Sequence, residues 1–214
     1  GSEAKESNRA LHALFVRAAA SVDPGLAAAI QLVETREEIS TMLELDDQID
    51  LMIPRGSNEL VRYIQQHTRI PVMGHADGIC HLFIDAQADA SMAVALTRDA
   101  KTQYPAVCNA IETLLVHAEA THTLPAIAAA VPEVELRGCE RTRAVIECAP
   151  ADEADWSTEY NDLVLSIRVV DSLDDAITHI NTHGSRHTDA IVTGNPASAR
   201  RFLTEVDSSS VLWN

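Results

Sequence analysis

The C-terminal part of the chain alternates short apolar runs with capped amphipathic segments. Residues 163–170 (LVLSIRVV) are the strongest strand candidate of the chain, since six of the eight are β-branched or leucine residues. Ser172 is suited to cap a helix after this run, and Gly184 is suited to end that helix. Residues 190–193 predict the next strand, and a further helix and strand follow. Such alternation constrains the chain to the α/β class, with parallel strands joined by right-handed helical crossovers.

The same alternation extends toward the N-terminus with shorter strand signals. Its clearest helix start is Thr35, which forms a capping-box sequence with Glu38. Hydrophobic residues make up 46% of the chain and aromatic residues only 4%, so the core must be mainly aliphatic. We expect additional helices to begin near residues 8, 57, 86, 121 and 196. We expect additional strands at residues 29–33, 50–53, 70–73, 81–84, 114–116, 134–136, 144–147 and 210–213.

Acidic residues outnumber basic ones by 32 to 16, which gives the 214-residue chain a formal net charge of −16. This charge argues against nucleic acid and anionic membranes as partners, and an anionic substrate must be attracted by local groups. No apolar run approaches the ~18 residues of a membrane span. The cysteines, at positions 80, 108, 139 and 148, form no CxxC pair, so we expect reduced thiols in a cytoplasmic protein.

Cys108 is the candidate nucleophile. It lies in residues 104–110 (YPAVCNA), between a predicted helix and a predicted strand. Pro105 suits the first position of a helical turn, so we expect Cys108 to lie beside unpaired backbone N–H groups, which favour the thiolate. Arg98 and Lys101 lie upstream as a further source of positive charge. The alternative interpretation is a packed core residue, because free cysteine is among the most buried residue types.

The segment 54–57 (PRGS) follows a predicted strand and opens a predicted helix. Ligands of open α/β sheets gather at the carboxyl ends of strands, and helix N-termini bind anions. From spacing alone, an ordinary loop in which Ser57 caps the helix is the favoured interpretation. The chain has no GxGxxG sequence and therefore no independent nucleotide-binding fingerprint.

Two groups of histidines have spacings that metal sites use, but neither predicts a metal centre. Residues 74–81 (GHADGICH) contain two histidines and a cysteine, and no third and fourth ligand has convincing spacing. We expect Cys80 there to be a packed residue. His179, His183 and His187 recur at intervals of four, but Gly184 should end the helix before the last of them. A solvated helix face is the favoured interpretation of these histidines.

Six blocks of sequence, in order along nearly the whole chain, resemble the gamma-glutamyl phosphate reductase family of the aldehyde dehydrogenase superfamily. The longest block surrounds Cys108, whereas residues 118–157 match poorly and contain no motif of the family. The blocks are residues 7–10 (SNRA), 49–56 (IDLMIPRG), 70–81 (IPVMGHADGICH), 104–117 (YPAVCNAIETLLVH), 159–163 (EYNDL) and 187–193 (HTDAIVT).

This resemblance implies an aldehyde-dehydrogenase-like fold and assigns roles to residues. Residues 1–78 are the expected later half of an NADP-binding Rossmann-type domain, and residues 79–214 the catalytic domain. Cys108 is the expected nucleophile, with the oxyanion stabilised by backbone N–H groups or by Asn109. The resemblance implies cofactor contacts for Arg55, Gly56, Ser57 and Glu159. It implies substrate contacts for His75, Asp77, Gly78 and Lys101.

The implied reaction is the NADPH-dependent reduction of L-glutamyl 5-phosphate to L-glutamate 5-semialdehyde with release of phosphate, in proline biosynthesis. The resemblance further implies that the chain is the middle and later part of a longer enzyme. That enzyme is expected to form a homo-oligomer and to associate or be fused with glutamate kinase. Two alternatives stay open: a non-catalytic structural or oligomerisation fragment, and another aldehyde dehydrogenase that forms acids.

Overall fold

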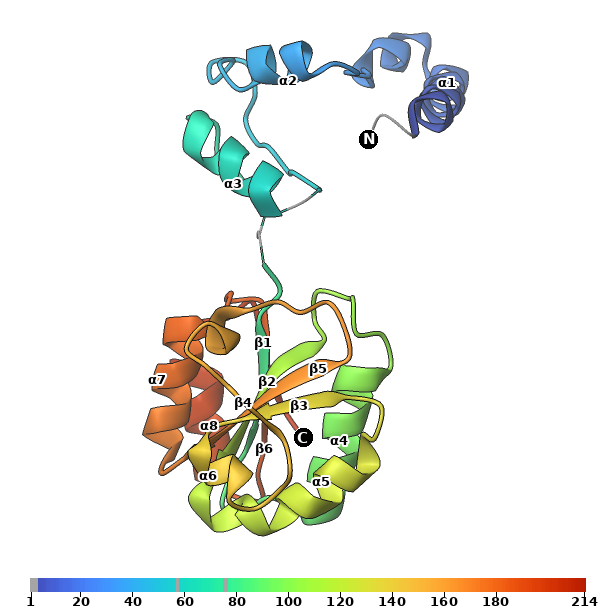
Figure 1. The fold of residues 1–214 in the computed structure, drawn as a ribbon. Helices are drawn as coiled ribbons and strands as arrows, with labels where there is room; N and C mark the ends of the chain where they lie inside the picture. The colour runs from blue at the N-terminus through green and yellow to red at the C-terminus, as the bar shows by residue number, and fades with distance from the viewer. Residues whose placement is uncertain (1–3, 57, 75–76) are drawn as a thin grey trace. The chain divides into compact units, whose positions relative to one another are not determined.

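The computed structural model describes residues 4–56, 58–74 and 77–214. The chain folds as two compact units, which comprise Gly1–Gly74 (unit 1) and His75–Asn214 (unit 2). Figure 1 shows both units as ribbons. Within the described ranges, no helix combines the length and the apolar content that crossing a membrane requires.

Unit 2 is built on one seven-stranded sheet in which every pair of neighbouring strands is parallel. The strand order is β4-β3-β5-β2-β1-β6-β7. The parallel α/β arrangement predicted from the alternation of apolar runs is thus confirmed for this unit. The strands are β1 (Cys80–Ile84), β2 (Ile111–His117), β3 (Glu135–Gly138), β4 (Ala149–Pro150), β5 (Val164–Val170), β6 (Thr188–Val192) and β7 (Ser210–Trp213).

Helices cover both faces of this sheet (Figure 1). The side chains of Leu82 and Phe83 point to opposite faces because successive residues of a strand alternate. Leu82 belongs to a core that includes residues of α4 and α5, and Phe83 to a core that includes residues of α7 and α8. Parallel strands that are covered on both faces have near-continuous apolar sequences, which explains the signal of residues 163–170. The helices are α4 (Ala90–Thr102), α5 (Leu124–Ala130), α6 (Glu140–Arg143), α7 (Leu173–His183) and α8 (Pro196–Glu205).

The helix starts follow the capping residues of the sequence. The Ser172 hydroxyl oxygen accepts a hydrogen bond from the Asp175 N–H at 3.1 Å, and α7 ends before Gly184, as predicted. The Asn195 side chain caps α8 in the same way. In unit 1, the predicted capping box is formed by Thr35 and Glu38, whose side chains each accept a backbone N–H of the other.

Unit 1 differs most from the sequence-based expectation. Within its described residues, strand pairing is limited to one parallel bridge between Met52 and Val72, so the predicted strands at 50–53 and 70–73 are reduced to that pair and 29–33 forms none. A strand needs a hydrogen-bonded neighbour on at least one side. The apolar side chains that a larger sheet would bury, such as those of Ile53 and Met73, remain largely exposed. The helices of unit 1 are α1 (Lys5–Val22), α2 (Arg36–Met42) and α3 (Asn58–His67).

In unit 2, one further expectation is wrong and another differs from the structure in where a helix begins. The predicted strand at residues 144–147 is the turn that follows α6, where the N–H groups of Val145 and Ile146 both donate to the carbonyl of Thr142. The predicted helix that begins near residue 121 is divided into a 3₁₀ segment, Ala118–Thr123, and α5. Pro125 lies in the first turn of α5, a position in which its missing N–H costs no hydrogen bond.

Candidate active site

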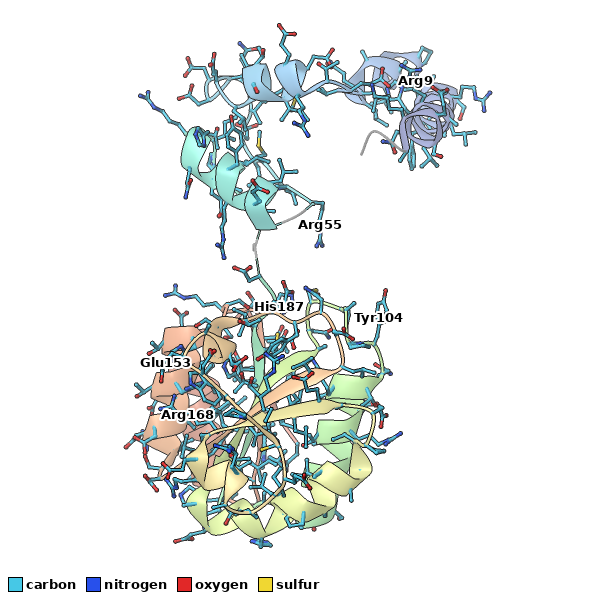
Figure 2. All side chains as sticks on the ribbon, in the orientation of Figure 1. Arg9, Arg55, Tyr104, Glu153, Arg168 and His187 are labelled. Atoms are coloured by element: carbon cyan, nitrogen blue, oxygen red, sulfur yellow. The ribbon has the colours of Figure 1, made fainter. Side chains whose placement is uncertain are left out.

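Three predicted site residues meet at the edge of the sheet where its strands begin. Gly78, Cys108 and Glu159 lie just before β1, β2 and β5, and these three strands are neighbours in the order β5-β2-β1. Because neighbouring parallel strands start at the same edge of a sheet, segments far apart in the sequence become adjacent there. Figure 2 shows Tyr104, on the loop of Cys108, and His187, just before β6, at this same end of unit 2.

Gly78 forms the contact that joins the three segments. Its backbone N–H donates a hydrogen bond to Oε1 of Glu159 at 2.9 Å. A β-carbon added at Gly78 would lie 2.4 Å from the carbonyl oxygen of Cys108 and 2.7 Å from Oε1 of Glu159. Real β-carbons do not approach other atoms so closely, so the segments can pack this tightly only around glycine.

Cys108 lies in a turn, and the predicted helical start at Pro105 is wrong. The Val107 N–H donates to the Tyr104 carbonyl at 3.2 Å, and the Ala110 N–H to the Val107 carbonyl at 2.9 Å, so two successive tight turns replace a helix. Among the described residues, the N–H groups of Cys108 and Asn109 donate to no backbone acceptor. The half-buried thiol therefore lies beside two available backbone donors without a helix dipole behind it.

The carbonyl of Cys108 is held by Cys80. The Cys80 thiol donates to this carbonyl oxygen at 3.3 Å, and Nδ1 of His187 lies 3.9 Å from the same sulfur. Cys80 is only 1% exposed, and burial, the largest cause, raises the pKa of its thiol to about 12. The prediction that Cys80 is a packed residue is confirmed.

The upstream cations do not play the parts predicted for them. Lys101 is fully buried, and its Nζ lies 2.6 Å from a carboxylate oxygen of Glu112, which is also buried. Arg98 donates to the carbonyl of Ala130 and pairs with Glu133 at 3.6 Å. The structure thus gives Lys101 an internal ion pair in place of the substrate contact that we predicted, because α4 directs it toward β2.

The ion pair between Lys101 and Glu112 supports the segment that contains Glu159. The other carboxylate oxygen of Glu112 accepts a hydrogen bond from the Asn161 N–H at 3.3 Å. Asn161 has a φ of 54°, in the left-handed region, which asparagine tolerates better than most residues. Burial is the largest influence on the Glu112 carboxyl and raises its pKa to about 7, even though Lys101 opposes this change.

A second network that the sequence did not reveal holds the same segment. The Tyr160 hydroxyl donates to Oδ1 of Asp155 at 2.6 Å and lies 2.8 Å from the Ser166 hydroxyl on β5. Arg137 donates to the same Asp155 oxygen at 2.8 Å, and its guanidinium lies 5.1 Å from the centre of the Tyr160 ring. Asp155 is buried, so these bonds satisfy its charge. In the sequence, Asp155 is one acid among many and has no distinguishing spacing.

The remaining predicted residues divide into three groups. Asn109 is exposed and Asp77 is half-buried in the segment before β1. Arg55 and Gly56 are exposed and belong to unit 1, whereas Gly78, Cys108 and Glu159 belong to unit 2. The predicted roles of Ser57 and His75 lie outside the described residues.

The histidines of α7 do not form the solvated face that we predicted. His179 is 6% exposed and is surrounded by other rings, with the ring centre of His183 at 4.5 Å, His81 at 5.4 Å and Trp156 at 5.7 Å. His81 is fully buried, and its Nδ1 lies 2.9 Å from Oδ1 of Asp189. No group of three or more metal-binding side chains with suitable geometry occurs in the part of the chain that the structure describes.

Comparison with known proteins finds relatives that share this sequence over their corresponding half. A gamma-glutamyl phosphate reductase from Pelotomaculum thermopropionicum is 57% identical over 219 aligned residues, which cover 100% of this chain and 50% of that protein. The chain is homologous to the gamma-glutamyl phosphate reductases. It spans about half the length of the curated relatives that it matches. No family model matches the chain.

Solved structures agree with the sequence relationship. A gamma-glutamyl phosphate reductase from Thermotoga maritima superposes with a TM-score of 0.94 at 36% identity, covering 100% of this chain and 53% of that chain. Glyceraldehyde-3-phosphate dehydrogenase GapN from Methanocaldococcus jannaschii, solved with NADP, has a TM-score of 0.62 at 12% identity, covering 81% of this chain and 47% of that one. That second similarity shows the fold alone. The chain therefore has the predicted aldehyde-dehydrogenase-like α/β fold.

Proposed function

We propose that this chain carries the nucleophile of a reductase that converts L-glutamyl 5-phosphate to L-glutamate 5-semialdehyde and phosphate. The observation that supports this proposal is the meeting of Gly78, Cys108 and Glu159 at one edge of the sheet. Each of these residues comes from a block of sequence that resembles the reductase family. A thiol with two available backbone N–H donors beside it suits acyl transfer, in which negative charge develops on a carbonyl oxygen.

In the proposed mechanism, the Cys108 thiolate attacks the acyl carbon of the substrate. The bond from that carbon to the phosphate oxygen breaks, which leaves an acyl thioester on Cys108 and releases inorganic phosphate. The N–H groups of Cys108 and Asn109 stabilise the oxyanion of the tetrahedral intermediate. After reduction of the thioester, the carbon–sulfur bond of the resulting thiohemiacetal breaks, so that the aldehyde is released and the thiolate is regenerated.

We propose NADPH as the cofactor, which supplies the hydride. Glu159 fits a role in holding a sugar hydroxyl of such a cofactor, because it places a carboxylate at the edge of the sheet that presents Cys108. The bond from Gly78 fixes one of its oxygens. Arg55, Gly56 and Ser57 are proposed contacts for the same cofactor. The NADP bound to GapN, a protein of the same fold, supports a nicotinamide nucleotide.

The test is a serine substitution of the proposed nucleophile in the enzyme expressed from its full reading frame. NADPH formation is measured with glutamate semialdehyde, NADP⁺ and phosphate, which is the reaction in reverse. We expect Cys108→Ser to lose at least about 10³-fold in rate, while Cys148→Ser, a change at another partly buried thiol, retains activity. Equal activity of both variants would refute the assignment of Cys108.

A further inference from the structure

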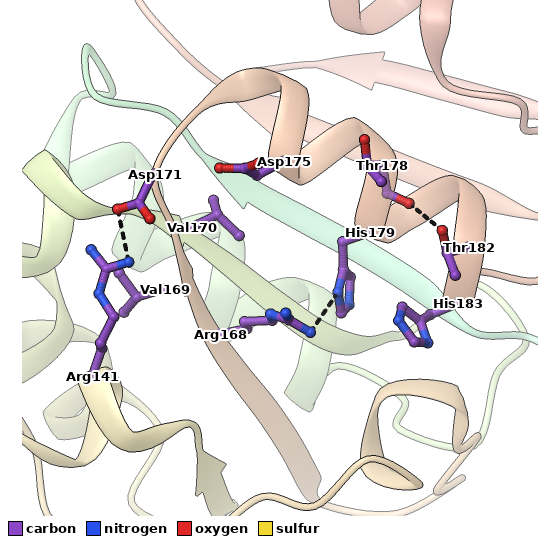
Figure 3. A pocket seen from close by; sticks show the side chains of 10 residues that line it. All are labelled: Arg141, Arg168, Val169, Val170, Asp171, Asp175, Thr178, His179, Thr182 and His183. Carbon is purple, nitrogen blue, oxygen red and sulfur yellow. Dashed lines mark hydrogen bonds and ion pairs between the residues drawn. The ribbon is translucent and has the colours of Figure 1, made fainter.

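A cavity of about 440 Å³ lies along α7, and none of Gly78, Cys108 and Glu159 lines it. Its walls come from the end of β5, from α6 and from α7 (Figure 3). The charged and titratable groups that face it come from each of these elements. They are Arg141, Arg168, Asp171, Asp175, His179 and His183.

Arg168 is half-buried in this cavity without an acidic partner. Its guanidinium lies 5.4 Å from the centre of the Trp156 ring, and its Nη1 lies 3.3 Å from Nδ1 of His179 (Figure 3). In the described part of the chain, no carboxylate lies within ion-pair distance of it. Arg137, also half-buried, binds both Glu135 and Asp155. A partly desolvated cation is stabilised by a nearby anion, so Arg168 is arranged to receive one from a ligand.

The histidines of the cavity do not compensate this charge. Burial is the largest cause that lowers the pKa of His179, to about 2, so its imidazole is neutral and accepts the hydrogen bond of Arg168. Burial also lowers the pKa of His183. Arg141 is already balanced, because it pairs with Asp171 at 2.8 Å. Arg168 is therefore the cation of the cavity that a ligand can satisfy.

Asp175 is the matching acid. Its exposed side chain lines the same cavity and, among the described residues, forms no ion pair, whereas the neighbouring Asp174 binds Arg201 at 2.6 Å. The cavity thus contains one positive and one negative group that are not paired with each other. A ligand that pairs with both groups must carry both a negative and a positive charge.

We propose that this cavity binds a small zwitterion of the α-amino acid class, with its carboxylate on Arg168 and its ammonium group near Asp175. The cavity is separate from the proposed catalytic site, but it lies next to the segment of Trp156 and Ser157, which continues to Glu159. Trp156 packs on Arg168, and the hydroxyl of Ser157 lies 3.1 Å from Nδ1 of His183, close in sequence to Glu159. An amino acid bound to Arg168 would change the surroundings of the Trp156 ring that packs on this arginine. The fluorescence of Trp156 should therefore report binding.

The test is a fluorescence titration of the chain with Trp213→Phe, which leaves Trp156 as the only indole. The probes are L-glutamate and L-alanine, and their matched controls are glutarate and propionate, which lack the ammonium group. We expect a saturable change with at least one amino acid, and binding of its control that is weaker by about tenfold or more. No saturable change with either amino acid, or equal binding of an amino acid and its control, would overturn the proposal.

Two variants assign the charges. Arg168→Gln should weaken amino acid binding by about tenfold or more, and Asp175→Asn should remove the preference for the amino acid over its control. Arg200→Gln, which removes an exposed cation from α8, should bind as the parent does. Circular dichroism confirms that each variant is folded. Binding by Arg168→Gln that equals that of Arg200→Gln would also overturn the proposal.

Discussion

The backbone N–H of Gly78 donates to the carboxylate of Glu159 at 2.9 Å, although 81 positions separate the two residues in the chain. The same glycine lies against the carbonyl of Cys108. One residue without a side chain thus sets the spacing between Cys108, the proposed nucleophile, and Glu159. This relationship makes the site sensitive to a single methyl group.

Gly78→Ala should disrupt that contact. The added β-carbon would lie 2.4 Å from the Cys108 carbonyl oxygen, so the backbone of at least one segment must move. Overpacking of this kind costs about 1–3 kcal/mol of unfolding free energy, which urea denaturation measures. The control is Gly25→Ala, where the nearest atom would be a side-chain oxygen at 3.2 Å. An unchanged unfolding free energy for Gly78→Ala would show that the segments are packed less closely.

Cys108 should be the thiol that limiting iodoacetamide modifies first at neutral pH. Cys80 is buried and its thiol has a pKa raised to about 12, mainly by burial, so it should react last. Burial is also the first cause that raises the pKa of Cys148. Mass spectrometry of the peptides gives the order. For Cys139, burial is the largest single influence and raises the pKa of the thiol, but the hydrogen bonds from Thr142, Val169 and Arg141 together lower it. Faster labelling of Cys139 than of Cys108 would contradict the assignment.

Tyr160→Phe should loosen the segment of Glu159. The change removes the hydrogen bond to Asp155 and the contact with Ser166, while Arg137 continues to satisfy the buried carboxylate. A hydrogen bond to a charged group contributes about 1.5–3 kcal/mol, so we expect a loss of that order in urea denaturation. Tyr104→Phe, at an exposed tyrosine, should change stability by less than about 0.5 kcal/mol. Equal unfolding free energies for the two variants would show that the Tyr160 hydroxyl does not stabilise the fold.

His179 should make the fold less stable in mild acid. Its pKa is lowered to about 2 in the folded state, mainly by burial, from an ordinary value near 6.5. Between these two pKa values His179 is protonated in the unfolded chain but neutral in the folded chain. The unfolding free energy therefore falls as the pH drops below 6.5 toward 2. From pH 6.5 to 5 the loss from this group is about 2 kcal/mol. His179→Gln should remove that part of the pH dependence, and an unchanged dependence would show that His179 is protonated in the fold.

The sequence predicted the parallel sheet of unit 2 well because its strands are covered on both faces, so segments such as residues 163–170 are mostly apolar and are interrupted only by Ser166 and Arg168. Caps such as Ser172 were predicted because their chemistry is local. The strands predicted in unit 1 did not form beyond one bridge, because strand pairing depends on neighbouring strands, which the periodicity of a segment does not reveal.

The site was predicted from the sequence only in part, for the same reason. The position of Cys108 came from its resemblance to the family, and the local argument for a helix N-terminus there was wrong. The sequence suggested ligand contacts at the carboxyl end of a strand for residues 54–57 alone, and it placed Cys108 and Glu159 before strands, but it did not show that Gly78, Cys108 and Glu159 meet at the amino ends of neighbouring strands. The buried partners of Lys101 and Tyr160 depend on packing across strands, which spacing along the chain does not contain.

The measurement that tests the central claim most directly is the phosphate dependence of the reverse reaction. The resemblance to the aldehyde dehydrogenase superfamily implies that acid-forming members have a water-activating glutamate in the matching segment. Here that segment reads GHADG, with no glutamate, and the alternative bases in it are His75 and Asp77. A positioned general base contributes about 10²–10⁴-fold, so the acyl thioester on Cys108 should resist water and transfer to phosphate. The enzyme from the full reading frame should form NADPH from glutamate semialdehyde and NADP⁺ only when phosphate or arsenate is added. Comparable NADPH formation with water alone would contradict the reductase mechanism and indicate an acid-forming dehydrogenase.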